Sequence, residues 1–250
     1  MATNFTAYDM VQWYWDIPVE RDANVSINKY LINHASTALT TKQTNVQNLY
    51  SAALVRKLSP RMAAFSRAKI GKATPTDLGH ILSLGVASDH FDKLKTTPQA
   101  WADANLGVDC TGFAIAYFDT LDSLSIDKGV YSGGVSCPWL LGTARKQKKP
   151  GTGEVLVWDV ADVSEDDIIL WMYANGKESR SPGHISIVYD VDASTNTLYC
   201  AESNGSVDRS GHAGPRYTQR SWGGVKGSGA GQYIELDKGA VVIIHPPTFP

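Results

Sequence analysis

The spacing of apolar residues along the chain changes character near its middle. In the first half, apolar side chains recur every three or four residues over 45–58 and 75–85, which is the period of an amphipathic helix. Thr97 followed by Pro98 is typical of a helix start, and Gly107 is suited to end that short helix. The first half is therefore predicted to be mainly helical.

Two further helices are predicted in the middle of the chain. Over 110–121, Phe113, Tyr117 and Leu121 fall on one stripe at helical spacing. A second segment, 139–147, follows a serine and a proline that favour a helix start. Both segments are expected to pack against the core on their apolar side.

The second half is rich in β-branched and aromatic residues, and the intervening residues are mostly Gly, Asp, Asn and Ser. The segment 165–173 fits either a buried strand or a helix, and 221–233 is predicted to be a hairpin loop because of its glycines. Helices followed by consecutive strands predict an α+β fold with an antiparallel sheet. The strands are predicted at 154–160, 184–191, 197–203, 232–236 and 240–245.

Composition narrows the classes of function. The chain has 23 basic and 25 acidic residues and a net charge of −2, without a long basic stripe, which argues against nucleic acid as a partner. No apolar run is long enough to span a bilayer. The first residues lack the basic and apolar regions of a secretory signal, so we expect a cytoplasmic protein or export by a non-classical route. No histidines show metal-ligand spacing, so no metal site is predicted.

Cys110 is the first candidate for chemistry. The chain has three widely spaced cysteines, which are predicted to be free thiols. A thiol in the first turn of a helix faces the positive end of the helix dipole, which favours the thiolate. Unsatisfied N–H groups there can also bind an oxyanion. The alternative is that Cys110 is a small apolar residue of the core.

His184 and the residues after the next strand complete a possible catalytic set. His184 begins a predicted strand directly after a loop, where a general base is well placed. The following strand ends in Glu202 and Asn204, which share one side of it by strand alternation. Either could orient the imidazole, and Glu202 is the first choice.

Taken together, these segments resemble the NlpC family of papain-like cysteine peptidases and amidases. The resemblance rests on the order and spacing of four motifs, over roughly 105–205. The motifs are "DCTGF", "TARKQKKPGTGEVLVWD", "GHISIVYD" and "YCAESNG". The resemblance implies a papain-like core with Cys110 as the nucleophile, His184 as the base and a polar third residue, without a cofactor.

The resemblance also implies a substrate. Many members cut amide bonds in peptidoglycan stem peptides, and the residues on either side of the cysteine help bind a substrate amine. Here those residues are Asp109 and Thr111, although Asp109 is equally suited to cap the helix. Relatives often carry a tyrosine and two glycines shortly before the cysteine. This chain has neither there, and Trp101 is a candidate for the aromatic role.

The hypothesis from the sequence is a hydrolase domain at 96–250 preceded by a helical extension at 1–95. The extension is interpreted as a binding or targeting module, a lid, or structural support. The alternatives are a non-catalytic wall-binding or scaffold protein, a CHAP-type amidase and an acyl-transferring cysteine enzyme. Whether an immunity or inhibitor protein binds the chain is left open.

Overall fold

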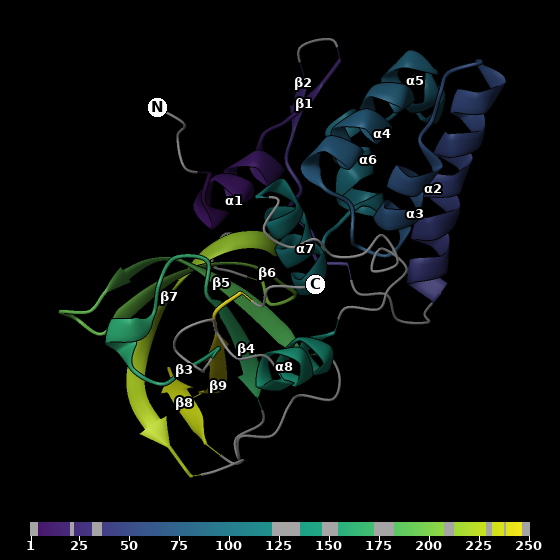
Figure 1. Cartoon of the computed structure of the whole chain (residues 1–250). Coiled ribbons are helices and arrows are strands. Elements are labelled where there is room, and N and C mark those ends of the chain that lie inside the picture. The colour runs from purple at the N-terminus through teal and green to yellow at the C-terminus, as the bar shows by residue number, and fades with distance from the viewer. Residues whose placement is uncertain are drawn as a thin grey trace. The chain divides into compact units, whose positions relative to one another are not determined.

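A computed structural model describes residues 5–20, 23–31, 37–121, 136–146, 155–172, 183–207, 213–228, 232–237 and 239–246. Its contacts divide the chain into two compact units. Figure 1 labels the helices and strands of the chain. Unit 1 comprises 1–10, 117–202 and 216–250, and unit 2 comprises 11–116 and 203–215. Unit 2 therefore includes residues on both sides of position 95. The expected division into 1–95 and 96–250 stays a prediction.

Unit 2 is mainly helical, as the sequence predicts. Its central helix is α4, which contacts four other helices and the short strand β1. A two-stranded antiparallel ribbon, β1 (Ile17–Val19) with β2 (Ala23–Val25), was not expected from the sequence. The helices lying wholly within unit 2 are α2 (Thr37–Val55), α3 (Met62–Lys69), α4 (Pro75–Ala87), α5 (His90–Leu94) and α6 (Pro98–Asn105).

Local capping explains where two of these helices begin. The side chain of Thr74 accepts a hydrogen bond from Asp77 N at 3.1 Å, and Asp77 Oδ2 accepts one from Thr74 N at 3.2 Å. Thr97 caps α6 in a similar way, with its hydroxyl 3.1 Å from Ala100 N. The predicted start at Thr97 and Pro98 is therefore confirmed.

Three of the remaining helices involve unit 1. The chain passes from one unit to the other within α1 (Ala7–Trp15) and within α7 (Cys110–Thr120), while α8 (Cys137–Lys146) lies in unit 1. The predicted helix at 110–121 is therefore confirmed to within one residue. The one predicted at 139–147 is confirmed over 139–146, and residue 147 lies outside the described residues. None of the helices in the described part of the chain is long and apolar enough to cross a membrane.

Unit 1 contains an antiparallel β-barrel. The strand order is β3-β9-β4-β5-β6-β7-β8, and the additional pairing of β8 with β9 closes six of the strands into a ring. Closure removes exposed strand edges. The strands are β3 (Leu156–Val157), β4 (Ile168–Met172), β5 (His184–Asp192), β6 (Thr197–Asn204), β7 (Gly214–Lys226), β8 (Tyr233–Leu236) and β9 (Gly239–Ile244).

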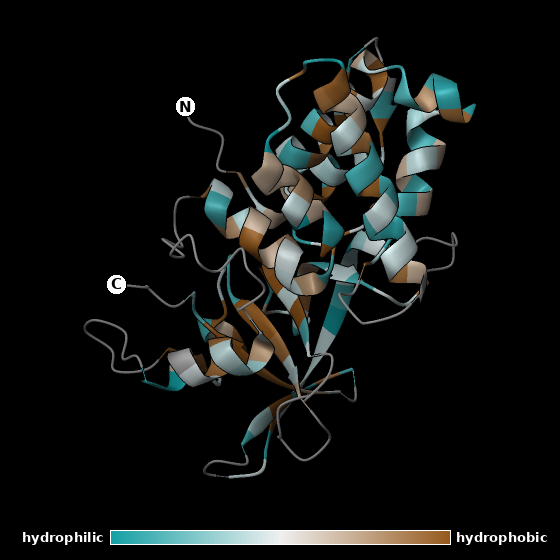
Figure 2. Cartoon of the chain, turned by 90° about the vertical axis from the view of Figure 1, so that its right-hand side faces the viewer, coloured by the Kyte–Doolittle hydropathy of each residue, from teal (hydrophilic) through white to brown (hydrophobic). Residues whose placement is uncertain are grey.

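The strands bury a common set of apolar side chains. Ile169, Val188, Leu198, Val241 and Ile243 belong to one cluster of buried residues. Figure 2 shows strongly apolar stretches in some of the strands, beside others that are more polar. The alternate residues of β4 and β9, among them Ile168, Leu170 and Val242, are buried as well, so these strands bury apolar side chains on both faces.

The structure settles or corrects three predictions for the second half. The ambiguous segment 165–173 contains a strand, β4. The strand predicted at 154–160 is shorter than expected: β3 has two residues, and Val160–Asp162 form a 3-10 turn. The hairpin loop predicted at 221–233 is wrong in its first part, because β7 continues to Lys226.

Two of the glycines that suggested this loop, Gly223 and Gly224, lie at a bulge in the strand instead. The register between β7 and β8 shifts between Trp222 and Val225, and Gly224 has a φ of +90°. A glycine adopts this conformation without steric cost, so the strand accommodates an irregularity and then continues.

Candidate active site

Cys110 is the first residue of α7, as the sequence predicts. Asp109 caps this helix: its Oδ1 accepts a hydrogen bond from Gly112 N at 2.6 Å, and its carbonyl oxygen accepts one from Phe113 N at 2.9 Å. The capping interpretation of Asp109 is therefore confirmed. Cys110 is buried, with 4% of its surface exposed.

The start of α7 packs tightly on the segment around Gly71. Asp109 N donates to Gly71 O at 3.0 Å. A Cβ at Gly112 would lie 2.2 Å from Gly71 O and 3.0 Å from Lys72 Cα. Only glycine allows this approach, so packing alone requires a glycine at position 112.

Lys72 is a buried cation next to the helix cap, and sequence reasoning missed it. Its Nζ donates to Asp109 Oδ1 at 2.7 Å and also to the hydroxyl of Thr111. Thr111 Oγ1 in turn donates to Asp109 Oδ1 at 2.9 Å. Asp109 and Thr111 were predicted to bind a substrate amine, and here they bind the amine of Lys72. Their role towards substrate stays a prediction.

Burial and the lysine act in opposite directions on Asp109. Burial raises the pKa of the Asp109 carboxyl, while the Lys72 ammonium and the Gly112 N–H oppose the rise. The net pKa lies above the ordinary value. The charged carboxylate at this cap therefore depends on Lys72.

Tyr30 places a hydroxyl beside the thiol. Its phenol oxygen lies 3.7 Å from Cys110 Sγ and is suited to donate to it. Burial, followed by the nearby Cys110 sulfur, raises the pKa of Tyr30 far above its ordinary value, so the hydroxyl keeps its proton. Sequence reasoning sought an aromatic residue shortly before the cysteine, whereas Tyr30 precedes it by 80 positions.

Trp101 occupies a different environment. It lies in α6, is nearly fully buried, and packs against Phe91 with ring centroids 5.6 Å apart. Its ring also lies edge-on to His90 at 6.2 Å. This placement makes Trp101 a core residue of the helical unit and gives no support to substrate binding, which stays a prediction.

In unit 1, the structure brings His184 and Glu202 together. His184 Nε2 lies 2.7 Å from Glu202 Oε2, and the Glu202 side chain is fully buried. The register of β5 and β6 explains the contact: Ser186 pairs with Glu202, and His184 lies two residues away on the same face of β5. Ser186 Oγ donates to the same oxygen at 2.7 Å.

Two arginines of β7 also bind Glu202. Arg216 donates from Nε and Nη2 to Oε1, at 3.1 Å each. Arg220 Nη2 lies 3.3 Å from Oε1 and 3.4 Å from Oε2. Neither arginine was singled out from the sequence, because the strand that carries them was not predicted.

The net result is a carboxylate that stays charged. Burial alone would raise the pKa of Glu202, but the hydrogen bond and charge of His184, the Ser186 hydroxyl and the Arg220 guanidinium lower it well below its ordinary value. Glu202 therefore accepts hydrogen bonds and does not donate them, so Nε2 of His184 carries the proton.

Asn204, the second candidate to orient His184, has another hydrogen-bond partner. Its Oδ1 accepts a hydrogen bond from Ser206 N at 2.9 Å. Glu202, the first choice, contacts the imidazole directly. A catalytic role of Asn204 stays a prediction.

A second histidine–carboxylate pair shows that such contacts are not confined to the candidate site. His245 Nδ1 lies 2.7 Å from Asp167 Oδ1, and Asp167 also accepts a hydrogen bond from Ser164 N at 3.0 Å. This pair connects the end of β9 to the turn before β4. It provides a matched control for experiments on His184.

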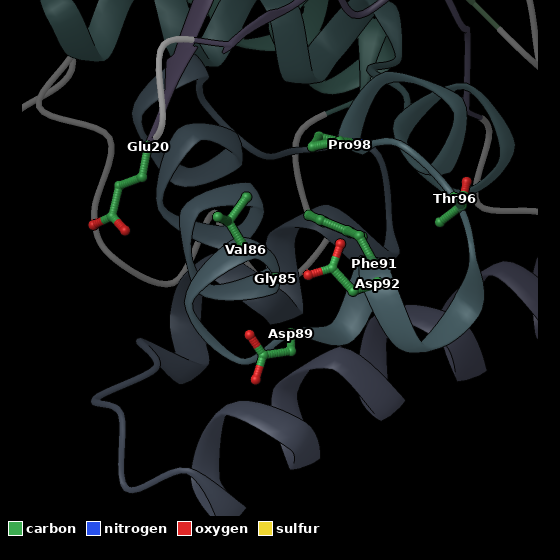
Figure 3. Close-up of a pocket in the computed structure, with 8 residues that line it drawn as sticks. All are labelled: Glu20, Gly85, Val86, Asp89, Phe91, Asp92, Thr96 and Pro98. Carbon is green, nitrogen blue, oxygen red and sulfur yellow. The ribbon is translucent and has the colours of Figure 1, made fainter.

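Unit 2 also has a cavity of about 220 Å³. Apolar residues, among them Val86 and Phe91, form part of its lining, and three carboxylates contribute the charge (Figure 3). None of the predicted site residues lines it. The lining residues are Glu20, Gly85, Val86, Asp89, Phe91, Asp92, Thr96 and Pro98.

No family model, curated protein or solved structure matches the chain. Within the residues that the structure describes, no cluster of His, Cys, Asp and Glu could hold a metal ion. A functional assignment therefore depends on the side chains themselves and on the sequence motifs that contain them.

Proposed function

We propose that this protein is a papain-like cysteine hydrolase that cleaves amide bonds in the stem peptides of peptidoglycan. Cys110 is the nucleophile, His184 transfers the proton and Glu202 orients His184. The observation that carries the proposal is the 2.7 Å hydrogen bond between His184 Nε2 and the fully buried Glu202. It fixes the imidazole proton on Nε2, the tautomer in which Nδ1 acts as the base.

The chemistry follows from that tautomer. With the proton on Nε2, Nδ1 is the nitrogen that accepts the proton of the Cys110 thiol. The thiolate attacks the amide carbonyl, and Nδ1 returns the proton to the departing amine. Water then gives a proton to Nδ1 and attacks the thioester, which releases the acid and restores the thiol.

The surroundings of Cys110 support the nucleophile. Cys110 lies in the first turn of α7, where the positive end of the helix dipole favours a thiolate. The Tyr30 hydroxyl lies 3.7 Å from the sulfur and retains its proton, so it can donate to a thiolate. The oxyanion of the intermediate would be held by the N–H of Cys110 and a neighbouring donor.

The proposed substrate class comes from the resemblance of the four motifs to the NlpC family. The test is to incubate muropeptides with the purified protein and to analyse the products by mass spectrometry. We expect new fragments with the native protein and none with Cys110→Ala or His184→Ala. His245→Asn, which alters the second histidine–carboxylate pair, should keep the activity. Full activity of Cys110→Ala would overturn the proposal.

A second candidate is a non-catalytic wall-binding protein, which the low exposure of Cys110 favours. The rate of thiol alkylation distinguishes the two. An activated Cys110 reacts with iodoacetamide at a pH well below that needed by Cys200, whose pKa is raised by burial. Equal rates at both thiols, together with retention on insoluble peptidoglycan, would support the binding role.

A further inference from the structure

We propose that Arg216 and Arg220 are positioning residues that fix the Glu202 carboxylate and lower the basicity of His184. This inference rests on the proposed function, in which His184 is the base. It assigns to β7 a part in the chemistry, although the strand contributes no reacting atom.

Arg216 reaches Oε1 of Glu202 with two nitrogens, and Arg220 reaches both carboxylate oxygens with one. The arginine side chains are 16% and 20% exposed, and Glu202 is fully buried. Charged hydrogen bonds shielded in this way restrict the carboxylate to one orientation, and with it the imidazole bonded to it.

Charged residues near His184 come from two neighbouring strands. From β6, Glu202 stabilises the protonated imidazole, while from β7 two guanidinium groups destabilise it. From β4, the Trp171 ring lies 6.2 Å from the His184 ring and carries no charge.

One further carboxylate faces this group of charges. Asp237, after β8, lies 3.5 Å from Nη1 of Arg220 and is 36% exposed, so it offsets that cation only in part. With His184 neutral, the two arginines balance the two carboxylates. Protonation of His184 would add a third positive charge, which favours the neutral base.

Arg220 occupies this position although one of its hydrogen-bond donors is unsatisfied. Its Nε is buried and has no hydrogen-bond partner among the described residues. Its guanidinium stacks over the Trp171 ring, 4.9 Å from the centroid. An unsatisfied buried donor is unfavourable. Its presence indicates that the placement of the charge beside Glu202 serves more than packing.

The experiment measures the titration of His184 directly. Imidazole resonances of the full chain are followed by NMR against pH in a Cys110→Ala background, where neither activity nor the thiol contributes. In this background we expect Arg220→Met and Arg216→Met each to raise the pKa of His184 by about one unit, because a nearby positive charge is removed. Arg220→Lys keeps the charge and should leave the pKa close to that of the background protein.

Lys226→Met is the matched control, because it removes an exposed positive charge from the same strand. It should leave the pKa of His184 unchanged. An unchanged pKa in folded Arg220→Met, as judged by near-ultraviolet circular dichroism, would overturn the inference. If that variant fails to fold, folded Arg216→Met decides the question by the same criterion.

The experiment also separates this inference from the proposed function. Activity of Cys110→Ala on muropeptides would remove the proposed function, yet the titration would still report whether the arginines depress the basicity of His184. Conversely, an active enzyme with a titration insensitive to both arginines would keep the function and remove this inference.

Discussion

Nζ of Lys72 lies 2.7 Å from Oδ1 of Asp109, the residue that caps the helix beginning at Cys110. Both side chains are buried, and both contact the hydroxyl of Thr111. Cys110, the proposed nucleophile, is the first residue of α7. The negative charge of the Asp109 cap is compensated by Lys72, from another part of unit 2. The stability of that helix start should depend on the compensation.

Lys72→Met tests this dependence. The substitution keeps the approximate length of the side chain but leaves the Asp109 carboxylate buried without its cation. Breaking a buried ion pair in this way costs about 3–5 kcal/mol, so we expect the free energy of unfolding in urea at pH 7 to fall by that amount. Lys69→Met, at an exposed hydrogen bond with Gln47, should cost less than about 1 kcal/mol. Similar losses in the two variants would contradict the expectation.

The same variant makes a prediction about pH. The pKa of Asp109 is already raised by burial, and loss of the lysine raises it further. A carboxyl whose pKa is higher in the folded than in the unfolded protein destabilises the fold when it ionises. The difference in unfolding free energy between wild type and Lys72→Met should therefore shrink as the pH falls, in urea titrations between pH 7 and pH 4. A constant difference would show that the lost charge is not the cause.

Two glycines in helices provide a matched test of the packing at the start of α7. A Cβ at Gly112 would lie 2.2 Å from Gly71 O, whereas a Cβ at Gly142 would meet no atom within 4 Å. Gly112→Ala should therefore lower the free energy of unfolding by about 1–3 kcal/mol or more. Gly142→Ala should raise it by about 0.5–1 kcal/mol, as alanine favours helix. Urea unfolding measures both, and a stabilising Gly112→Ala would refute the close approach.

Much of the fold could be predicted because its signals are local. Thr97 and Pro98 mark the start of α6 by their own side chains, and the apolar spacing of 75–85 identifies α4. The strand β7 could not be predicted in this way, because Gly223 and Gly224 interrupt the alternation of its side chains. Only the pairing with β8 shows that the chain continues as a strand.

The residues of the candidate site differ in the same way: some have local signals in the sequence, and others do not. Cys110, His184 and Glu202 could be singled out because each stands in a short motif at the end of an element. Their supporting residues could not, since the contacts are made by distant parts of the chain: Lys72 contacts Asp109 across 37 positions, and Tyr30 contacts Cys110 across 80. No pattern within either segment indicates these partners.

The low pKa of Glu202 predicts how stability depends on acid. Because the pKa is lower in the folded protein, the ionised carboxylate stabilises the fold at pH values above its ordinary value of about 4.3. This stabilisation is lost as the pH falls towards the folded pKa. Urea unfolding from pH 6 to pH 3 should show a steep loss for the wild type and a shallower one for Glu202→Gln. The exposed Glu165→Gln should retain the wild-type slope, and a wild-type slope in Glu202→Gln would contradict the assignment.

Tyr30→Phe tests the hydroxyl beside the thiol. A hydrogen bond to a charged group contributes about 1.5–3 kcal/mol, so loss of the donor should raise the pKa of the Cys110 thiol by about one unit or more. The pH at which iodoacetamide alkylates Cys110 measures this shift. Tyr50→Phe, whose ring packs edge-on against Phe65, should leave the profile unchanged. If Tyr30→Phe also leaves it unchanged, the hydroxyl only fills space beside the sulfur. A shift accompanied by a roughly tenfold lower rate of muropeptide cleavage would show that the donor acts on the reacting thiolate.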